Sequence, residues 1–116
     1  MIDFEIQINK EGTGFEKGFP LLKFLDEKYT MLHELNRCDA SYIIDDVMPN
    51  LEKVLAGDLD SYEFGYDSTL IDFLKNKAVI SYNFGDDNLE IGSGLVYNFM
   101  RVWCEYLVKW EKTINP

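Results

Sequence analysis

The chain begins with a regular alternation of apolar and polar side chains. Between Ile2 and Asn9 every second residue is apolar: Ile2, Phe4, Ile6 and Ile8. A period of two places successive side chains on opposite sides of an extended backbone, so this stretch predicts a strand with one buried face. The glycine-rich residues 11–18 that follow predict a loop.

Two stretches with a helical period come next. From Pro20 to about Cys38, apolar residues recur at intervals of three and four: Leu21, Leu22, Leu25, Tyr29, Leu32 and Leu35. Because proline is tolerated in the first turn of a helix, we expect a helix that begins at Pro20. A second helix is predicted over residues 41–56, with Asp39 placed to cap its start and Gly57 to end it. Pro49 either kinks this second helix or restarts it.

The pattern changes after Gly57 to short stretches with a period of two. Residues 58–61 predict a turn, and residues 62–66 predict a strand. Residues 69–74 and 78–84, separated by Lys75-Asn76-Lys77, predict a hairpin, although 69–74 also fit a short helical period. A turn over residues 85–88 and a short strand at Leu89 and Ile91 complete this part of the chain.

The last apolar run, Leu95 to Trp110, predicts a C-terminal helix. Its expected buried stripe is Val96, Phe99, Trp103, Tyr106, Leu107 and Trp110. Ser93 is placed to cap the start of this helix. Since each fully buried large side chain contributes roughly 1.5–3 kcal/mol, we expect the preceding elements to cover this stripe.

The predicted order is strand, helix, helix, three or four strands and helix. Consecutive strands joined by short turns form antiparallel sheets, and helices then pack on one face. The fold class expected from the sequence is therefore a single α+β domain over residues 1–116. It has an antiparallel sheet of about four strands, helices on one face and a C-terminal aromatic helix.

Composition indicates where the protein acts. The first five residues carry acids where a secretory signal would carry bases, and no apolar run approaches the length of a membrane span. The two cysteines, Cys38 and Cys104, are far apart in the sequence, and both are expected to be reduced thiols. We therefore expect a cytoplasmic protein that does not associate with a membrane.

Charge narrows the choice of partner. The formal net charge is −10, which disfavours binding to nucleic acid or to an anionic membrane because phosphates would be repelled. Residues 39–72 carry nine acidic residues and one lysine, a net charge of −8, whereas residues 73–116 balance. An excess of this kind either solubilises the protein or attracts a basic partner.

Candidate catalytic and metal-binding patterns are weak. The acid pairs Asp45-Asp46, Asp58-Leu59-Asp60 and Asp86-Asp87 lie in turn-like or solvent-facing contexts, whereas a hydrolase needs one carboxyl in an apolar pocket. His33, the only histidine, lies off the apolar stripe and is expected to be solvated or capping. No zinc, Walker or nucleophile-elbow motif occurs. We therefore expect no enzymatic activity, no catalytic residue, no metal and no cofactor.

The acidic segment also contains aromatic residues. If Phe64 packs inward, one row of acids faces outward with tyrosines nearby, a combination suited to binding lysine and arginine. The partner-binding residues expected on this basis are Asp45, Asp46, Asp58, Asp60, Tyr62, Glu63, Tyr66 and Asp67.

The second half of the chain contains four features whose order along the sequence can be compared with known families. They are Tyr62-Glu63-Phe64-Gly65, the hairpin over Ser68–Phe84, the Asp86-Asp87 turn and the tryptophan-bearing helix Leu95–Trp110. This succession resembles small bacterial immunity proteins that protect cells from polymorphic toxins, including those of contact-dependent growth inhibition systems. The resemblance implies a cytoplasmic, non-enzymatic inhibitor that binds the toxin domain of its own system, frequently a nuclease. A nuclease holds phosphates with basic residues, and an acidic protein can mimic that substrate.

Two other interpretations stay open from the sequence. One is a structural or regulatory subunit that interacts with other proteins and whose acidic segment only solubilises it. The other is a small enzyme that uses the acidic turns with a metal ion. Neither the pattern nor the composition specifies an oligomeric state.

Overall fold

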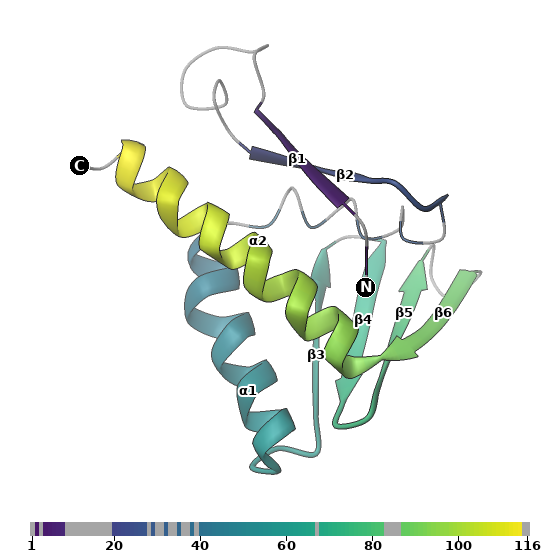
Figure 1. The fold of residues 1–116 in the computed structure, drawn as a ribbon. Helices are drawn as coiled ribbons and strands as arrows, with labels where there is room; N and C mark the ends of the chain where they lie inside the picture. Colours follow the sequence, from purple (N-terminus) through teal and green to yellow (C-terminus); the bar gives the residue numbers. More distant parts are fainter. Residues whose placement is uncertain are drawn as a thin grey trace.

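Four strands form an antiparallel sheet in which each strand pairs with the next one along the chain (Figure 1). They are β3 (Ser61–Tyr66), β4 (Thr69–Leu74), β5 (Lys77–Tyr82) and β6 (Asp87–Gly92). The computed structural model describes residues 2, 4–8, 20–27, 29, 32, 35, 38, 40–66, 68–82 and 87–114. The predicted strand over residues 62–66, the predicted hairpin and the last strand at Leu89 and Ile91 are confirmed. This last strand already begins at Asp87, so the turn predicted over residues 85–88 is wrong at Asp87 and Asn88, which pair with β5. The predicted loop over residues 11–18, the cap at Asp39 and the first two residues of the predicted 85–88 turn lie outside the described residues.

The described elements cover one face of this sheet. On β4 the buried side chains are Thr69, Ile71 and Phe73, and on β5 they are Ala78 and Ile80. The helices α1 (Met48–Ala56) and α2 (Ser93–Ile114) lie on that side of the sheet (Figure 1). Side chains along these strands therefore alternate between buried and more exposed positions, as is typical of an antiparallel sheet with one solvated face. The expected α+β class with helices on one face is confirmed.

The first strand belongs to a second, smaller sheet. β1 (Phe4–Ile8) pairs antiparallel with β2 (Pro20–Phe24), in a register that sets Phe4 opposite Phe24. The helix predicted to begin at Pro20 is therefore wrong over residues 20–24. Because the two-stranded sheet consists only of edge strands, proline is tolerated as the first residue of β2.

Aromatic packing fixes this hairpin on α2. The Phe99 ring of α2 lies 5.0 Å from the Phe4 ring in an edge-to-face arrangement and 5.5 Å from the Phe24 ring. Leu22 on the same strand face is buried, while Leu25 is exposed. Residues 20–24 therefore form a strand, although their apolar spacing also fits a helix, because the strand packs Phe24 against Phe99.

The residues after β2 still enter the core as the sequence suggests. Tyr29, Leu32, Leu35 and Cys38 are all buried, and the first three lie in 3₁₀ turns. Their spacing of three matches the 3₁₀ period better than the α-helical one. His33 lies outside the described residues.

The long C-terminal helix begins at Ser93, as the sequence predicts to within two residues. The buried stripe differs in one respect from the expected one. Met100 is fully buried, whereas Tyr106 is 43% exposed and carries the Lys109 ammonium 5.7 Å from its ring centre. Tyr106 lies about 80° around the helix axis from Val96, at the edge of the covered stripe. The confirmed stripe is Val96, Phe99, Trp103 and Leu107, with Trp110 half-buried beyond it.

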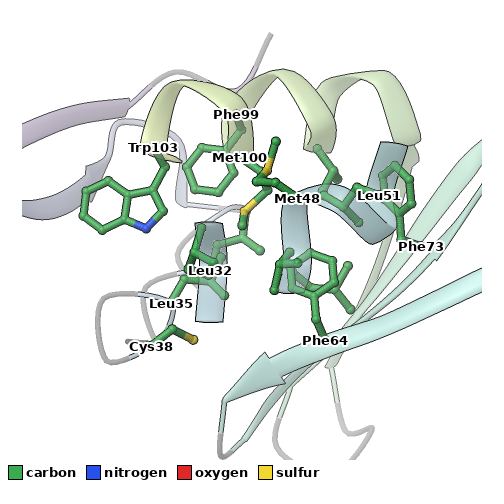
Figure 2. Close-up of a cluster of buried hydrophobic side chains, with 14 of the residues drawn as sticks. Leu32, Leu35, Cys38, Met48, Leu51, Phe64, Phe73, Phe99, Met100 and Trp103 are labelled. Carbon is green, nitrogen blue, oxygen red and sulfur yellow. The ribbon is translucent and has the colours of Figure 1, made fainter. Parts of the chain in front are cut away.

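The core is continuous from the sheet to α2. Met48 and Leu51 lie between the side chains of α2 and those of the sheet, with Phe64 and Phe73 on the sheet side (Figure 2). Trp103 is 1% exposed. The aromatic helix is therefore the element against which the hairpin, α1 and the sheet are all packed.

Candidate functional site

The first predicted contacts, Asp45 and Asp46, lie on a π-helical turn, η3 (Tyr42–Val47), that leads directly into α1. The backbone N–H of Met48 donates to the carbonyl of Ile43, five residues earlier. The widened turn precedes Pro49, which has no N–H to donate, and the Asn50 side chain donates to the Asp46 carbonyl over 2.7 Å. The helical stretch thus continues through Pro49, and both aspartates are exposed.

The opposite end of this helical stretch carries Asp58 and Asp60. Gly57 adopts a left-handed conformation with φ of 87°, and the Asp58 N–H donates to the Lys53 carbonyl over 2.8 Å. This is a Schellman-type end, which confirms Gly57 as the helix stop. It leaves Asp58, Leu59 and Asp60 exposed between α1 and β3.

The two predicted contacts on β3 point to different sides of the sheet. Tyr62 shares the helix-facing side with the buried Phe64, and their ring centres are 6.0 Å apart. Tyr62 is half-buried and close to Tyr42, whose phenol pKa is raised by burial and by the neighbouring Tyr62. Glu63 is exposed on the other side. The side chain of Tyr66 and all of Asp67 lie outside the described residues.

Within the described residues, the predicted contacts lie in four places: the η3 turn, the loop between α1 and β3, the helix-facing side of β3 and its outer side. Asp46 and Asp58 lie toward opposite ends of the η3–α1 stretch, whose rise separates them by roughly 18 Å along the axis. Such a distance is about twice the screening length at physiological ionic strength, so the two groups attract a ligand largely independently. Glu63 lies on the far side of the sheet. Asp58 and Asp60 share the short loop between α1 and β3, but the fold does not gather the full predicted set into one patch.

Within the described residues, none of these carboxylates forms an ion pair with a basic side chain. Within the described part of the chain the ion pairs are Lys77–Glu90 at 3.7 Å and Arg101–Glu105 at 2.9 Å. Neither pair involves a predicted contact residue. The exposed acids at Asp45, Asp46, Asp58, Asp60 and Glu63 are thus free to act on a cationic partner.

Cys104 on α2 lies within the electrostatic influence of three acids that the sequence alone did not bring together, and one of them is Asp45 of the predicted set. Burial raises the pKa of this half-buried thiol, and Glu105, Glu52 and Asp45 raise it further. Both Cys104 and the buried Cys38 are free thiols, as expected. Because the raised pKa keeps Cys104 protonated at neutral pH, the geometry does not activate it as a nucleophile.

Asp72 and Glu90 are two further acids that the sequence analysis did not single out. They lie on the solvent side of β4 and β6, and the strand register places them in the same cross-strand row as Glu63. The alternation along β4, in which the polar Asp72 stands between the apolar Ile71 and Phe73, is the signal that could have placed Asp72 on the outer face.

Among the described residues, no group of three or more histidine, cysteine, aspartate or glutamate side chains is arranged to hold a metal ion. No described helix is long and apolar enough to cross a membrane. Comparison of the chain with known protein families, with curated proteins and with solved structures gives no match. The described residues of the candidate site offer exposed carboxylates at Asp45, Asp46, Asp58, Asp60 and Glu63.

Proposed function

We propose that this protein is a non-enzymatic immunity protein that binds and neutralises a basic toxin domain, most simply a nuclease. The observation that supports this proposal is the set of exposed carboxylates between residues 45 and 63, none of which pairs with a basic residue in the described part of the chain. The resemblance of the second half of the chain to toxin-immunity proteins supports the same function.

Electrostatics gives this function a physical basis. A nuclease concentrates Lys and Arg where it holds phosphates, and an acidic protein can occupy that surface in place of the substrate. Separated acidic groups at Asp45–Asp46 and Asp58–Asp60 would speed the encounter by steering, and the closer contacts would slow dissociation. Association should therefore weaken as salt is added, because exposed charges are screened.

The first test uses the toxin-like C-terminal domain that an immunity gene's upstream neighbour encodes in the native host. Co-expression of that domain with this chain should restore growth, and the purified chain should inhibit the domain's nuclease activity at a one-to-one ratio. Absence of a toxin-like domain upstream, or no effect on its toxicity, would overturn the proposal.

The alternative, a structural or regulatory subunit with a merely solubilising acidic segment, makes the opposite prediction for one variant. Neutralising Asp58, Asp60 and Glu63 together should slow association with the toxin domain at least tenfold if the acids steer it. Unchanged binding to a partner would instead favour the solubilising role.

A further inference from the structure

The face of the four-stranded sheet that points away from the helices is not covered by any described element. Beside Lys77 and the polar residues Ser61, Ser81 and Asn88, this face carries three acids and three apolar side chains: Glu63, Leu70, Asp72, Leu74, Val79 and Glu90. Leu70 is 44% exposed, although it lies within β4, a central strand of the sheet. We refer to these six residues as the open face.

The strand register arranges these side chains in rows across the sheet. Glu63 pairs with Asp72, Asp72 pairs with Val79, and Val79 pairs with Glu90. Leu70 and Leu74 lie on either side of Asp72 along β4, on the same face. Asp72 is therefore surrounded by Leu70, Leu74 and Val79, with Glu63 as its neighbour on the edge strand.

The Glu63–Asp72 pair is an unfavourable arrangement in the free protein. Two residues join β3 to β4, so Tyr66 and Thr69 form a hydrogen-bonded pair and Glu63 and Asp72, three steps away, a non-hydrogen-bonded one. Residues in such pairs approach to about 4.5 Å between Cα atoms, and like charges placed directly opposite are destabilising. The nearby Lys77 pairs with Glu90 instead, at 3.7 Å. A cationic group from outside would relieve this repulsion.

We propose that the open face is the docking surface for the basic partner, which inserts a Lys or Arg side chain between Glu63 and Asp72 and packs apolar groups on Leu70 and Val79. This inference rests on the proposed function and names the surface that carries it. An arginine fits best, because its planar guanidinium can bond two carboxylates at once while stacking on apolar neighbours.

Charge selects this occupant over a second copy of the same chain. Two open faces placed together would bring the carboxylates of Glu63 and Asp72 against their own kind, in a protein with a net charge of −10. A partner with the opposite charge gains both attraction and burial of Leu70.

The size of the face indicates what lies at its rim. Four strands of six residues make a surface of roughly 20 Å by 20 Å, about half of the 800 Å² that each partner buries in a standard interface. Additional contacts must therefore come from neighbouring segments. The exposed Asp58–Leu59–Asp60 loop leads directly into β3 and is well placed to supply them.

The test compares two double variants that remove the same amount of charge. Glu63→Gln with Asp72→Asn removes the facing pair, and Glu5→Gln with Glu27→Gln removes two exposed acids from the segment around the β1–β2 hairpin. Binding of each to the purified upstream toxin domain is measured by calorimetry, alongside thermal melting. We expect the first variant to bind at least tenfold more weakly while melting at the same temperature as wild type or higher. We expect the second to bind within threefold of wild type.

A second pair of variants tests the apolar part of the face. Leu70→Ser should weaken binding at least fivefold, whereas Leu25→Ser, at a leucine that is 58% exposed on another segment, should leave binding unchanged. If wild type binds the toxin domain and both open-face variants bind as tightly, the docking inference is wrong and the proposed function stands. If wild type itself fails to bind, the proposed function fails and the docking inference fails with it.

Discussion

The side-chain hydroxyl of Ser93 donates a hydrogen bond of 2.6 Å to the backbone carbonyl of Lys75. Ser93 is the first residue of α2 and is 3% exposed, and Lys75 lies in the turn between β4 and β5. The contact therefore ties the start of the long helix to the far end of a hairpin 18 residues earlier. The sequence suggested a local capping role for Ser93, and the fold gives its hydroxyl a long-range partner.

Replacing Ser93 with alanine should lower the free energy of unfolding by roughly 1–2 kcal/mol, because a partly buried carbonyl loses its donor. Urea denaturation measures the change. Ser81→Ala is the matched control, since its hydroxyl bonds Asn88 on the exposed surface and its loss should change stability by less than about 0.5 kcal/mol. Equal effects of the two substitutions would show that burial of the Ser93 contact does not matter.

Gly65 is required by a close approach of the backbone. A Cβ atom at this position would overlap the carbonyl oxygen of Thr69 across the β3–β4 hairpin. Gly65→Ala should therefore destabilise the protein by at least about 2 kcal/mol, measured by thermal or urea unfolding. Gly94→Ala is the control, because a Cβ on this α2 residue meets open space and should stabilise by a few tenths to about 1 kcal/mol. A neutral Gly65→Ala would contradict the close approach.

Trp103 and Tyr106 occupy the same helix but should respond very differently to truncation. Trp103→Ala should lower stability by roughly 3–5 kcal/mol because it empties part of the core. Tyr106→Ala should lower it by less than about 1 kcal/mol because that side chain is already 43% exposed. Chemical denaturation of both variants measures the difference, and similar losses would contradict the assignment of the buried stripe.

The indole nitrogen of Trp103 makes a further comparison informative. It is buried and has no hydrogen-bond partner in the described structure. Phenylalanine removes this unpartnered donor while keeping most of the ring, so Trp103→Phe should lose less than half the stability that Trp103→Ala loses. Equal losses in the two variants would indicate that the nitrogen is satisfied in solution.

Alkylation of Cys104 should be slow at pH 8. Burial, and then Glu105, Glu52 and Asp45, raise the pKa of this thiol, so less of it is thiolate than in an unfolded chain. Glu52→Gln removes one of the negative charges and should speed reaction with iodoacetamide about two- to threefold, followed at Cys104 by peptide mass spectrometry. Glu63→Gln, on the other side of the sheet, is the control and should have no effect.

Because the pKa of the Cys104 thiol is raised in the folded protein, the stability should depend on pH in the alkaline range. Above about pH 8.5 the unfolded chain loses the Cys104 proton before the folded protein does. This thiol therefore lowers the stability as the pH rises further, and Cys104→Ala should reduce the loss measured between pH 8 and pH 10.

The sequence by itself determined the elements whose patterns are unambiguous. The alternation in β1, the Gly57 helix stop and the aromatic C-terminal helix all follow from neighbours within a few residues. It also determined the excess of acidic residues between residues 39 and 72, because the net charge of a segment depends only on its amino-acid composition. These features depend on composition and on the spacing of residues close together in the sequence, so they do not require long-range contacts.

Only the tertiary structure decided the segment that begins at Pro20. Its leucines fit a helix, but β1 needed a partner strand and Phe99 offered a surface for Phe4 and Phe24. The same is true of the candidate site. Because Phe64 is buried, Tyr62 turns toward the helices and Glu63 turns outward, and the strand register then sets Glu63 opposite Asp72. Cross-strand neighbours are nine residues apart here, and no pattern within a single strand specifies which residues will face each other.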